Sequence, residues 1–381
     1  MRTQLKKGLA VFLSVCCLSG CGNGTNQPAG SNETVQKETL AETIETEKET
    51  ESTEAKTGAV EQNEHSKAIL VVSFGTSYND NREASIGAIE KAVADEFPSY
   101  QVRRAFTSQT IIDKLKERDQ LEIDNVTDAL ERAVADGIKE LIVQPTHLMD
   151  GYEYNDILNE LSAYVDQFDK IIVGKPLLSS DKDFDMVVEA ITEQTASYDD
   201  GKTAICFMGH GTEADSNSVY EKMQRTLTEK GFEHYYIGTV DAEPGINDVI
   251  EALNTKGSYE KVVLLPLMVV AGDHANNDMA GDDADSWKMI LEEEGFQVES
   301  VLEGLGQVPA ICHIYVEHLK TALEEGSVLT GEEKQTKELD NGTYTIEVES
   351  SSSMFRIVKA ELTVTDSGMS GVITLSGTGY G

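Results

Sequence analysis

The sequence predicts an α/β protein with two parallel-sheet domains related by internal duplication, followed by a short C-terminal β segment. Three observations lead to this prediction. Apolar runs suited to buried strands alternate with segments of helical period between residues 67 and 325. Two strand segments of the first half recur, with their following loops, in the second half. Beyond residue 333, apolar and polar residues alternate between turn-rich breaks, as in antiparallel strands.

Residues 1–21 have the pattern of an export signal. A basic start precedes the apolar run Gly8–Leu18, which is too short to span a bilayer. The following letters "LSGC" have the form of a lipobox, the bacterial site where a signal is cleaved and the new N-terminal cysteine is lipidated. We therefore expect an extracytoplasmic protein anchored to a bacterial membrane through Cys21. A plain signal peptide without lipidation is the alternative.

Residues 22–67 are predicted to be a disordered acidic tether. They are rich in Glu, Thr, Ser, Lys, Asn and Gln and contain no aromatic residue, so they lack the apolar surface that would offset the entropy of ordering. They also hold many of the acids behind the formal net charge of -37, which argues against a nucleic-acid partner. A spacer that lifts a domain off a membrane is the simplest function, and metal buffering by the Glu-rich tail is the alternative.

The first domain is predicted to span 68–198. It opens with "AILVVSFG", a continuous apolar run typical of a strand covered on both faces, followed by "NREASIGAIEKAVADEF", which has helical period. The same alternation continues along the domain. Strands are expected at 68–75, 100–107, 139–147 and 171–178, and helices at 81–97, 125–138 and 183–196.

The second domain is predicted to span 199–326 and the β-rich appendage 333–381, which stops as if the module were incomplete. Strands of the second domain are expected at 202–211, 235–242 and 261–270, and helices at 216–231 and 246–257. Its two cysteines, Cys206 and Cys312, lie in apolar stretches and are expected to be buried free thiols. No CxxC pattern occurs, which argues against a thiolate zinc site.

The internal repeat brings three chemically active side chains to equivalent places. Glu153, His210 and His274 all follow predicted strands, at the carboxyl ends where open α/β sheets bind ligands. In the repeat, Phe74-Gly75-Thr76 lies over His210-Gly211-Thr212, and Gly151, Glu153 and Asn155 lie over Gly272, His274 and Asn276.

Two imidazoles and one carboxylate suit a borderline divalent metal such as Co(II), Fe(II), Ni(II) or Zn(II), and they serve equally well as general bases. Taken singly, each has an ordinary explanation: a hydrogen-bonded loop histidine for His274, a turn residue for His210 and a surface acid for Glu153. Their shared placement at matching strand ends favours a site. His147, near the same loop, is a candidate to support it.

Several blocks in this order resemble a known family: "LVVSFGTSYND", "RAFTSQTIIDKL", "HLMDGYEY", "KPLLSSDKDF", "FMGHGTEA", "LPLMVVAGDHANNDMAGDDADSWK" and "GLGQVPAI". They are similar to the anaerobic cobalt chelatases of the CbiK type, which are sirohydrochlorin cobaltochelatases of the class II chelatase superfamily. The resemblance covers Ala68 to Leu323. It implies the chelatase fold, a pair of Rossmann-like domains with the active site between them.

The resemblance also implies an activity, the insertion of a divalent metal into a tetrapyrrole such as sirohydrochlorin in anaerobic cobalamin-type biosynthesis. Co2+ is favoured, Fe2+ and Ni2+ are alternatives, and neither ATP nor an organic cofactor is expected. His210 and His274 would bind the metal and share the proton load, and Glu153 would act as ligand or base. Thr76, Ser77, Ser179 and Ser180 are candidate anchors for the substrate's carboxylates, with helix capping as the alternative.

The export signal departs from a family of mostly cytoplasmic enzymes. This departure leaves a second function possible, a lipoprotein that binds a metal or a tetrapyrrole such as haem or a corrinoid without turnover. A surface lipoprotein with a decayed site is a third reading, weakened because every candidate side chain is present. The appendage is either a stabilising or surface-interaction element or a ligand-binding β module for haem or its relatives, and the sequence indicates no oligomeric state.

Overall fold

The computed structural model describes residues 66–256, 259–326, 328–329, 342–346, 356–365 and 368–376. The predicted signal, residues 22–65 of the predicted tether and the lipidation site Cys21 lie outside these residues. In the described part of the chain, no helix is both long enough and apolar enough to cross a bilayer.

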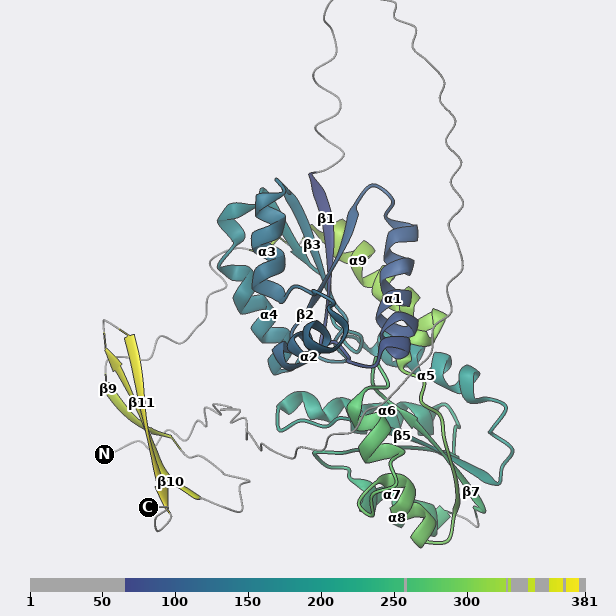
Figure 1. The fold of residues 1–381 in the computed structure, drawn as a ribbon. Helices are drawn as coiled ribbons and strands as arrows, with labels where there is room; N and C mark the ends of the chain where they lie inside the picture. Colours follow the sequence, from purple (N-terminus) through teal and green to yellow (C-terminus); the bar gives the residue numbers. More distant parts are fainter. Residues whose placement is uncertain are drawn as a thin grey trace, which may run out of the picture. The chain divides into compact units, whose positions relative to one another are not determined.

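The first sheet has four parallel strands in the order β2-β1-β3-β4, with helices on its faces (Figure 1). Its central strand β1 is almost entirely buried, as expected for a parallel strand covered on both sides. The elements are β1 Lys67–Ser73, α1 Asn79–Glu96, β2 Gln101–Phe106, α2 Gln109–Asp119, α3 Val126–Ala135, β3 Glu140–Pro145, α4 Tyr152–Ser162, the 3-10 turn η1 Val165–Gln167 and β4 Lys170–Val173.

The second sheet repeats this arrangement, with four parallel strands in the order β6-β5-β7-β8. The elements are α5 Asp181–Thr195, β5 Thr203–Gly209, the 3-10 turn η2 Asp215–Asn217, α6 Ser218–Glu229, β6 Tyr235–Thr239, α7 Ile246–Lys256, β7 Lys261–Pro266, the π-helical turn η3 Ala275–Met279, α8 Trp287–Glu293, β8 Gln297–Ser300, the 3-10 turn η4 Leu305–Gln307 and α9 Pro309–Glu325.

The two sheets confirm the predicted α/β class and the duplication. In each sheet, the strand that follows the central strand in sequence lies on one side of it, and the next strand lies on its other side. The strand order therefore reverses between β1 and β3 in the first sheet and between β5 and β7 in the second. Ligands of open α/β sheets bind outside the carboxyl ends of the strands at such a reversal. Glu153, His210 and His274 each follow one of these four strands.

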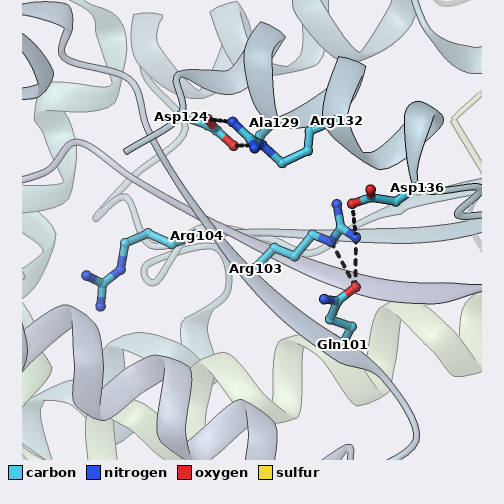
Figure 2. Close-up of a pocket in the computed structure, with 7 residues that line it drawn as sticks. All are labelled: Gln101, Arg103, Arg104, Asp124, Ala129, Arg132 and Asp136. Carbon is cyan, nitrogen blue, oxygen red and sulfur yellow. Dashed lines mark hydrogen bonds and ion pairs between the residues drawn. The ribbon is translucent and has the colours of Figure 1, made fainter. Parts of the chain in front are cut away.

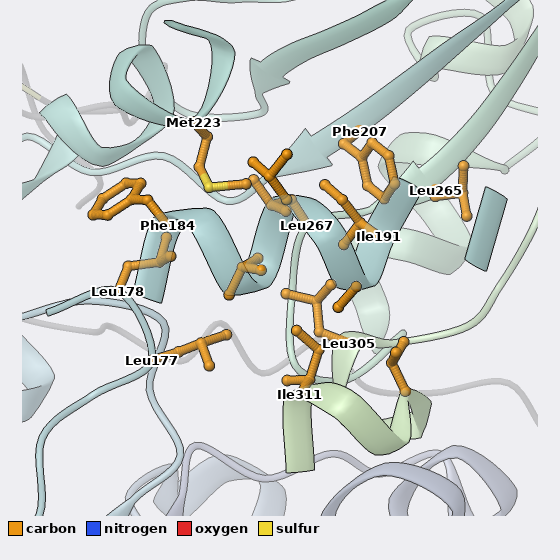
Figure 3. Packing of buried hydrophobic residues seen from close by; sticks show 14 of the residues in the cluster. Leu177, Leu178, Phe184, Ile191, Phe207, Met223, Leu265, Leu267, Leu305 and Ile311 are labelled. Carbon is orange, nitrogen blue, oxygen red and sulfur yellow. The ribbon is translucent and has the colours of Figure 1, made fainter. Parts of the chain in front are cut away.

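Two helices cross the boundary predicted between residues 198 and 199. Helix α5 belongs to the first predicted domain, yet Phe184 and Ile191 pack with Phe207 of the second sheet (Figure 3). Helix α9 belongs to the second predicted domain, yet Val316 and Leu319 pack on the first sheet with its strands β1, β3 and β4. Each helix therefore ties its own half of the chain to the sheet of the other half.

Polar contacts also hold α5 and α9 in place. Ser180 caps α5 and forms a reciprocal capping box with Asp183. The other carboxylate oxygen of Asp183 lies 3.0 Å from Nε2 of His318 on α9, and both side chains are nearly buried. The Tyr315 hydroxyl of α9 donates to the Thr146 carbonyl at 2.8 Å.

The remaining elements confirm some expectations and extend others. The predicted C-terminal β segment contains an antiparallel sheet of β9 Gly342–Ile346, β10 Arg356–Thr365 and β11 Gly368–Ser376. Cys206 and Cys312 are buried free thiols, as predicted. Elements α2, α4, α8 and β8 had not been assigned from the sequence, and the strand expected at 261–270 ends at Pro266 because the chain turns there.

Candidate active site

The structure brings the two predicted histidines together. His210 directly follows β5, and His274 lies beyond the end of β7, the neighbouring strand. Their ring centroids are 4.5 Å apart and the ring planes meet at 84°. The two side chains are 52% and 37% exposed, so a ligand can reach both.

Each ring is oriented through Nδ1. The Nδ1 of His210 lies 2.9 Å from the Gly211 carbonyl oxygen, and the Nδ1 of His274 lies 2.7 Å from Oδ2 of Asp278. Carbonyl and carboxylate oxygens only accept hydrogen bonds, so Nδ1 is the nitrogen that carries the hydrogen in both rings. The lone pair of a neutral ring then sits on Nε2, which is the usual arrangement of a metal-binding imidazole with a supporting acceptor behind it.

The polar residues crowded around His274 build the turn that presents it. Ala275 and Met279 of the π-helical turn η3 are buried, while the Asn276 side chain donates to the Gly272 carbonyl at 2.7 Å. Single π-helical turns are rare in proteins, and those that occur often lie at functional sites. The acid- and amide-rich stretch after β7 is therefore the support of one histidine.

A cavity of about 470 Å³ adjoins the histidine pair. It is formed by the end of β6, the start of α7 and the stretch after β7, and four carboxylates line it: Asp241, Glu243, Asp278 and Asp285. Two of them contact the pair, since Asp278 bonds His274 and Oδ2 of Asp241 lies 3.6 Å from Nδ1 of His210. The resulting negative potential favours cations next to the imidazoles.

Asp241 was missed by sequence reasoning. It lies two residues beyond β6, and its backbone N–H donates to the His210 carbonyl at 2.9 Å. The sequence does contain a signal for it, because "YYIGTVDA" is predicted to be a strand segment and its acid falls at the same carboxyl-end edge as the histidines.

Glu153, the third predicted site residue, lies in the first turn of α4 and contacts a different histidine. Its Oε2 is 3.3 Å from Nε2 of His147, and among the described residues no ion pair joins it to His210 or His274. In the same part of the chain, no group of three or more His, Cys, Asp or Glu side chains is arranged to hold a metal ion. The chain just before α4 lies near the second domain, because a Cβ added at Gly151 would lie 3.4 Å from the Ser216 hydroxyl, in the loop after His210.

The loop after β1 and the first turn of α1 lie against the loop that carries His274. The Asn81 side chain accepts a hydrogen bond from the Ala271 N–H at 2.8 Å, and a Cβ added at Gly272 would be 3.4 Å from Thr76 Oγ1. Burial raises the pKa of Tyr78, and the charge of Asp273 and a hydrogen bond to it raise the pKa further. The two domains therefore meet beside the histidine pair.

The predicted anion anchors make internal contacts. Thr76 and Ser77 are buried; Thr76 Oγ1 accepts from the Tyr78 N–H at 3.2 Å, and the Ser77 carbonyl accepts from Arg118 at 2.6 Å. The N–H groups of Ser179 and Ser180 both donate to the Asp183 carboxylate, at 3.2 and 2.7 Å. Helix capping, the alternative considered for these residues, is the role seen at Ser180.

A second cavity, of about 270 Å³, lies away from this site, on the edge strand β2 and helix α3 (Figure 2). Three arginines line it, but each is already paired. Arg103 contacts Asp136 at 2.7 Å, Arg132 contacts Asp124 at 2.7 Å, and Arg104 forms two 2.6 Å bonds with Glu90. These guanidinium groups stabilise the fold, and the histidine pair remains the candidate site.

Comparison with known proteins gives consistent matches over the two α/β domains. The family described as cobalt chelatase (CbiK) matches residues 67–324. A sirohydrochlorin cobaltochelatase of Salmonella typhimurium is 40% identical over 257 residues, covering 68% of this chain and 96% of that protein. The sirohydrochlorin cobaltochelatase CbiKC of Nitratidesulfovibrio vulgaris is 31% identical over 259 residues, covering 68% and 90%. Among solved structures, SirB from Bacillus subtilis with Fe3+ has 15% identity and a TM-score of 0.48, covering 68% of this chain and 98% of that one.

Proposed function

The chain belongs to the CbiK family of cobalt chelatases, and from this premise we propose that it inserts Co2+ into sirohydrochlorin or a closely related tetrapyrrole. The protein is a metal chelatase, and the observation that carries the more specific proposal is the His210–His274 pair. Both imidazoles are partly exposed, and their ring centroids are 4.5 Å apart. Each ring has an acceptor at Nδ1, which leaves Nε2 free to bind a metal.

The reaction exchanges one divalent cation for two protons. The metal ion must lose water, and the macrocycle must lose its two pyrrole N–H protons before four nitrogens can bind the metal. His210 and His274 would take the ion from water, while the carboxylates of the adjoining cavity raise the local concentration of cations. Glu153, on the facing domain, would accept protons from the macrocycle as a general base.

The identity of the metal is part of the proposal. Imidazole and carboxylate ligands accept Co2+, Fe2+ and Ni2+ alike, and selection among them depends on geometry and supply. Co2+ is proposed because both curated relatives named above are cobaltochelatases. We propose no organic cofactor for the reaction.

A spectrophotometric insertion assay tests the activity. The purified protein is mixed with sirohydrochlorin and Co2+, and loss of the metal-free absorption spectrum is followed beside a protein-free control. We expect His210→Ala and His274→Ala to abolish the acceleration. His313→Ala is the matched control, because His313 is an exposed histidine on α9 that forms an ion pair with Glu317. A wild-type rate equal to the protein-free rate would refute the chelatase proposal for this substrate.

We further propose that the enzyme is exported and held at a membrane by lipid on Cys21. The support is the lipobox pattern of residues 18–21 and the polar tether that follows. Metabolic labelling with a fatty-acid analogue should mark the protein, and Cys21→Ser should abolish both labelling and membrane association. Cys17→Ser, within the same signal, should change neither. Loss of labelling in both variants, or in neither, would contradict the assignment.

The same export pattern favours one alternative function, a lipoprotein that binds a metal or a tetrapyrrole such as haem or a corrinoid without turnover. The insertion assay separates the two functions. A stable shift in the tetrapyrrole spectrum with no acceleration over the control would identify a binding protein. Acceleration that requires both histidines would identify the enzyme.

A further inference from the structure

His147 is a buried histidine whose hydrogen-bonding capacity is unmet. Its side chain is 7% exposed, and neither ring nitrogen has a hydrogen-bond partner among the described residues. One charged group lies beside it, Oε2 of Glu153, at 3.3 Å from Nε2. This contact is an ion-pair distance whose geometry falls short of a hydrogen bond.

The unmet nitrogens point to a role beyond packing. Burial of a polar group without a partner opposes folding, and an apolar side chain of similar size would fill the same space without that penalty. Hydrogen bonds of catalytic groups are often long in the absence of substrate and tighten when substrate binds. The 3.3 Å contact fits this description.

The His147 side chain is more confined than that of Glu153. The His147 carbonyl accepts from the Leu177 N–H at 2.9 Å, and the preceding Thr146 carbonyl accepts from the Tyr315 hydroxyl of α9 at 2.8 Å. Glu153, by contrast, is 50% exposed and lies in the first turn of α4. The imidazole is thus the stationary partner and the carboxylate the movable one.

The direction of the hydrogen bond follows from the chemistry of the pair. An ionised carboxylate only accepts, so Nε2 of His147 must carry the hydrogen when the two groups bond. One carboxylate oxygen is then held by the ring, and the other is free to face the macrocycle. Such a supporting bond fixes a functional group within the narrow range of positions that reaction requires.

We propose that His147 is a positioning residue for Glu153, which donates Nε2–H to one carboxylate oxygen and aims the other at the pyrrole N–H groups of the bound tetrapyrrole. The kinetic part of this inference rests on the proposed function. The contact itself is independent of turnover, so it has a test of its own.

A double-mutant cycle tests both parts. The variants are His147→Leu, His147→Gln, Glu153→Gln and the double variant His147→Leu/Glu153→Gln, with His313→Leu as the control for loss of an imidazole. We expect His147→Leu to lower kcat for metal insertion by about 10- to 100-fold, as outer supporting residues do. KM should change little. His147→Gln, which keeps an amide donor, should recover part of the rate, and the double variant should be no slower than Glu153→Gln.

Stability supplies the second readout. If the buried nitrogens serve Glu153 and not the fold, His147→Leu should leave Tm unchanged or raise it, while a purely structural histidine would lower Tm together with activity. The inference is overturned if rate losses are additive, if His147→Gln recovers nothing, or if Tm falls in step with the rate.

The cycle also separates this inference from the proposed function. If the wild-type protein inserts no metal, the proposed function fails. The Tm values alone then decide whether His147 and Glu153 interact. A Tm shift for Glu153→Gln that depends on residue 147 supports the pairing, and additive shifts overturn it. If His147→Leu does not fold, the same comparison is made with His147→Gln.

Discussion

The ring of His274 stands edge to face against the ring of His210, with centroids 4.5 Å apart. The two residues are distant in sequence and adjacent in space because β5 and β7 are parallel neighbours at the reversal of strand order. Each ring has its own acceptor at Nδ1, a main-chain carbonyl for one and a carboxylate for the other. The two histidines should therefore respond differently when these acceptors are altered.

Removal of the Asp278 carboxylate should weaken metal binding at His274. We expect Asp278→Ala to reduce the affinity for Co2+ by about 10- to 100-fold, because the ring loses the acceptor that fixes its orientation and tautomer. Asp278→Asn keeps an acceptor oxygen and should lose less. Isothermal titration of Co2+ measures the change.

Asp282→Ala is the matched control for this prediction. Asp282 is an acid of the same stretch, but it is 92% exposed and pairs with Lys288 at 2.8 Å. Its removal should leave Co2+ affinity near that of the wild type. Equal losses in the two alanine variants would mean that the general negative charge of the stretch, and not the bond to His274, governs binding.

The sequence was informative where periodicity and strand ends decide the structure. The four strand ends of the repeat and the histidine positions follow from apolar runs that stop at polar residues, and the structure places His210 and His274 side by side. His147 is predicted from the sequence as a supporting residue of the site, but its contact with Glu153 could not be predicted in this way. Whether a carboxylate meets His147 or His274 depends on how the two domains face each other, which no local pattern encodes.

The packing of α5 and α9 against the sheet of the other half could not be predicted from the sequence either. Both helices have apolar faces suited to either sheet, and chain order, the natural guide to domain membership, does not reveal that each packs against the sheet of the other half. Helices α2 and α4 escaped assignment because their many polar residues leave only a few buried apolar side chains each. The apolar pattern of the sequence therefore identifies a helix or a strand better than it identifies the elements that pack against it.

The two buried thiols should be unreactive in the folded protein. Burial raises the pKa of Cys312 to about 11 and raises the pKa of Cys206 well above its ordinary value. The thiolate is the reacting form, so at pH 8 both should resist iodoacetamide. Mass spectrometry of the peptides that contain them should show labelling only after denaturation. Rapid labelling of either thiol in the native protein would contradict the packing of its core.

Stability should fall in acid through Asp183. Burial raises the pKa of this carboxyl, but hydrogen bonds from His318 and Ser180 outweigh burial and bring the pKa below its ordinary value. A carboxyl with a lowered folded-state pKa stabilises the protein above its unfolded pKa of about 3.9, and this stabilisation is lost as the pH falls through the folded value. Asp183→Asn should therefore cost about 3 kcal/mol near neutral pH.

Urea unfolding across the acid range measures this difference. The gap in unfolding free energy between wild type and Asp183→Asn should be full at pH 7 and should shrink below about pH 4, as the wild-type carboxyl takes up its proton. Asp181→Asn is the control, because Asp181 is 93% exposed and its pair with Lys222 should contribute little. A gap that stays constant down to low pH would show that the amide disturbs the helix cap by its shape and not by its charge.

Gly211 should be required for the position of His210. It has a φ of +88°, and an added Cβ would lie 2.8 Å from the Ala242 nitrogen, next to Asp241. Gly211→Ala must therefore bear a left-handed backbone, at about 1–3 kcal/mol, and must also push apart the two loops that carry the site. Gly137→Ala separates these effects, since Gly137 has a φ of +76° with nothing within 4 Å of an added Cβ. We expect both variants to lose stability in urea unfolding, and only Gly211→Ala to lose Co2+ affinity. If Gly211→Ala binds Co2+ as tightly as Gly137→Ala does, the contact with Ala242 does not set the geometry of the histidine pair.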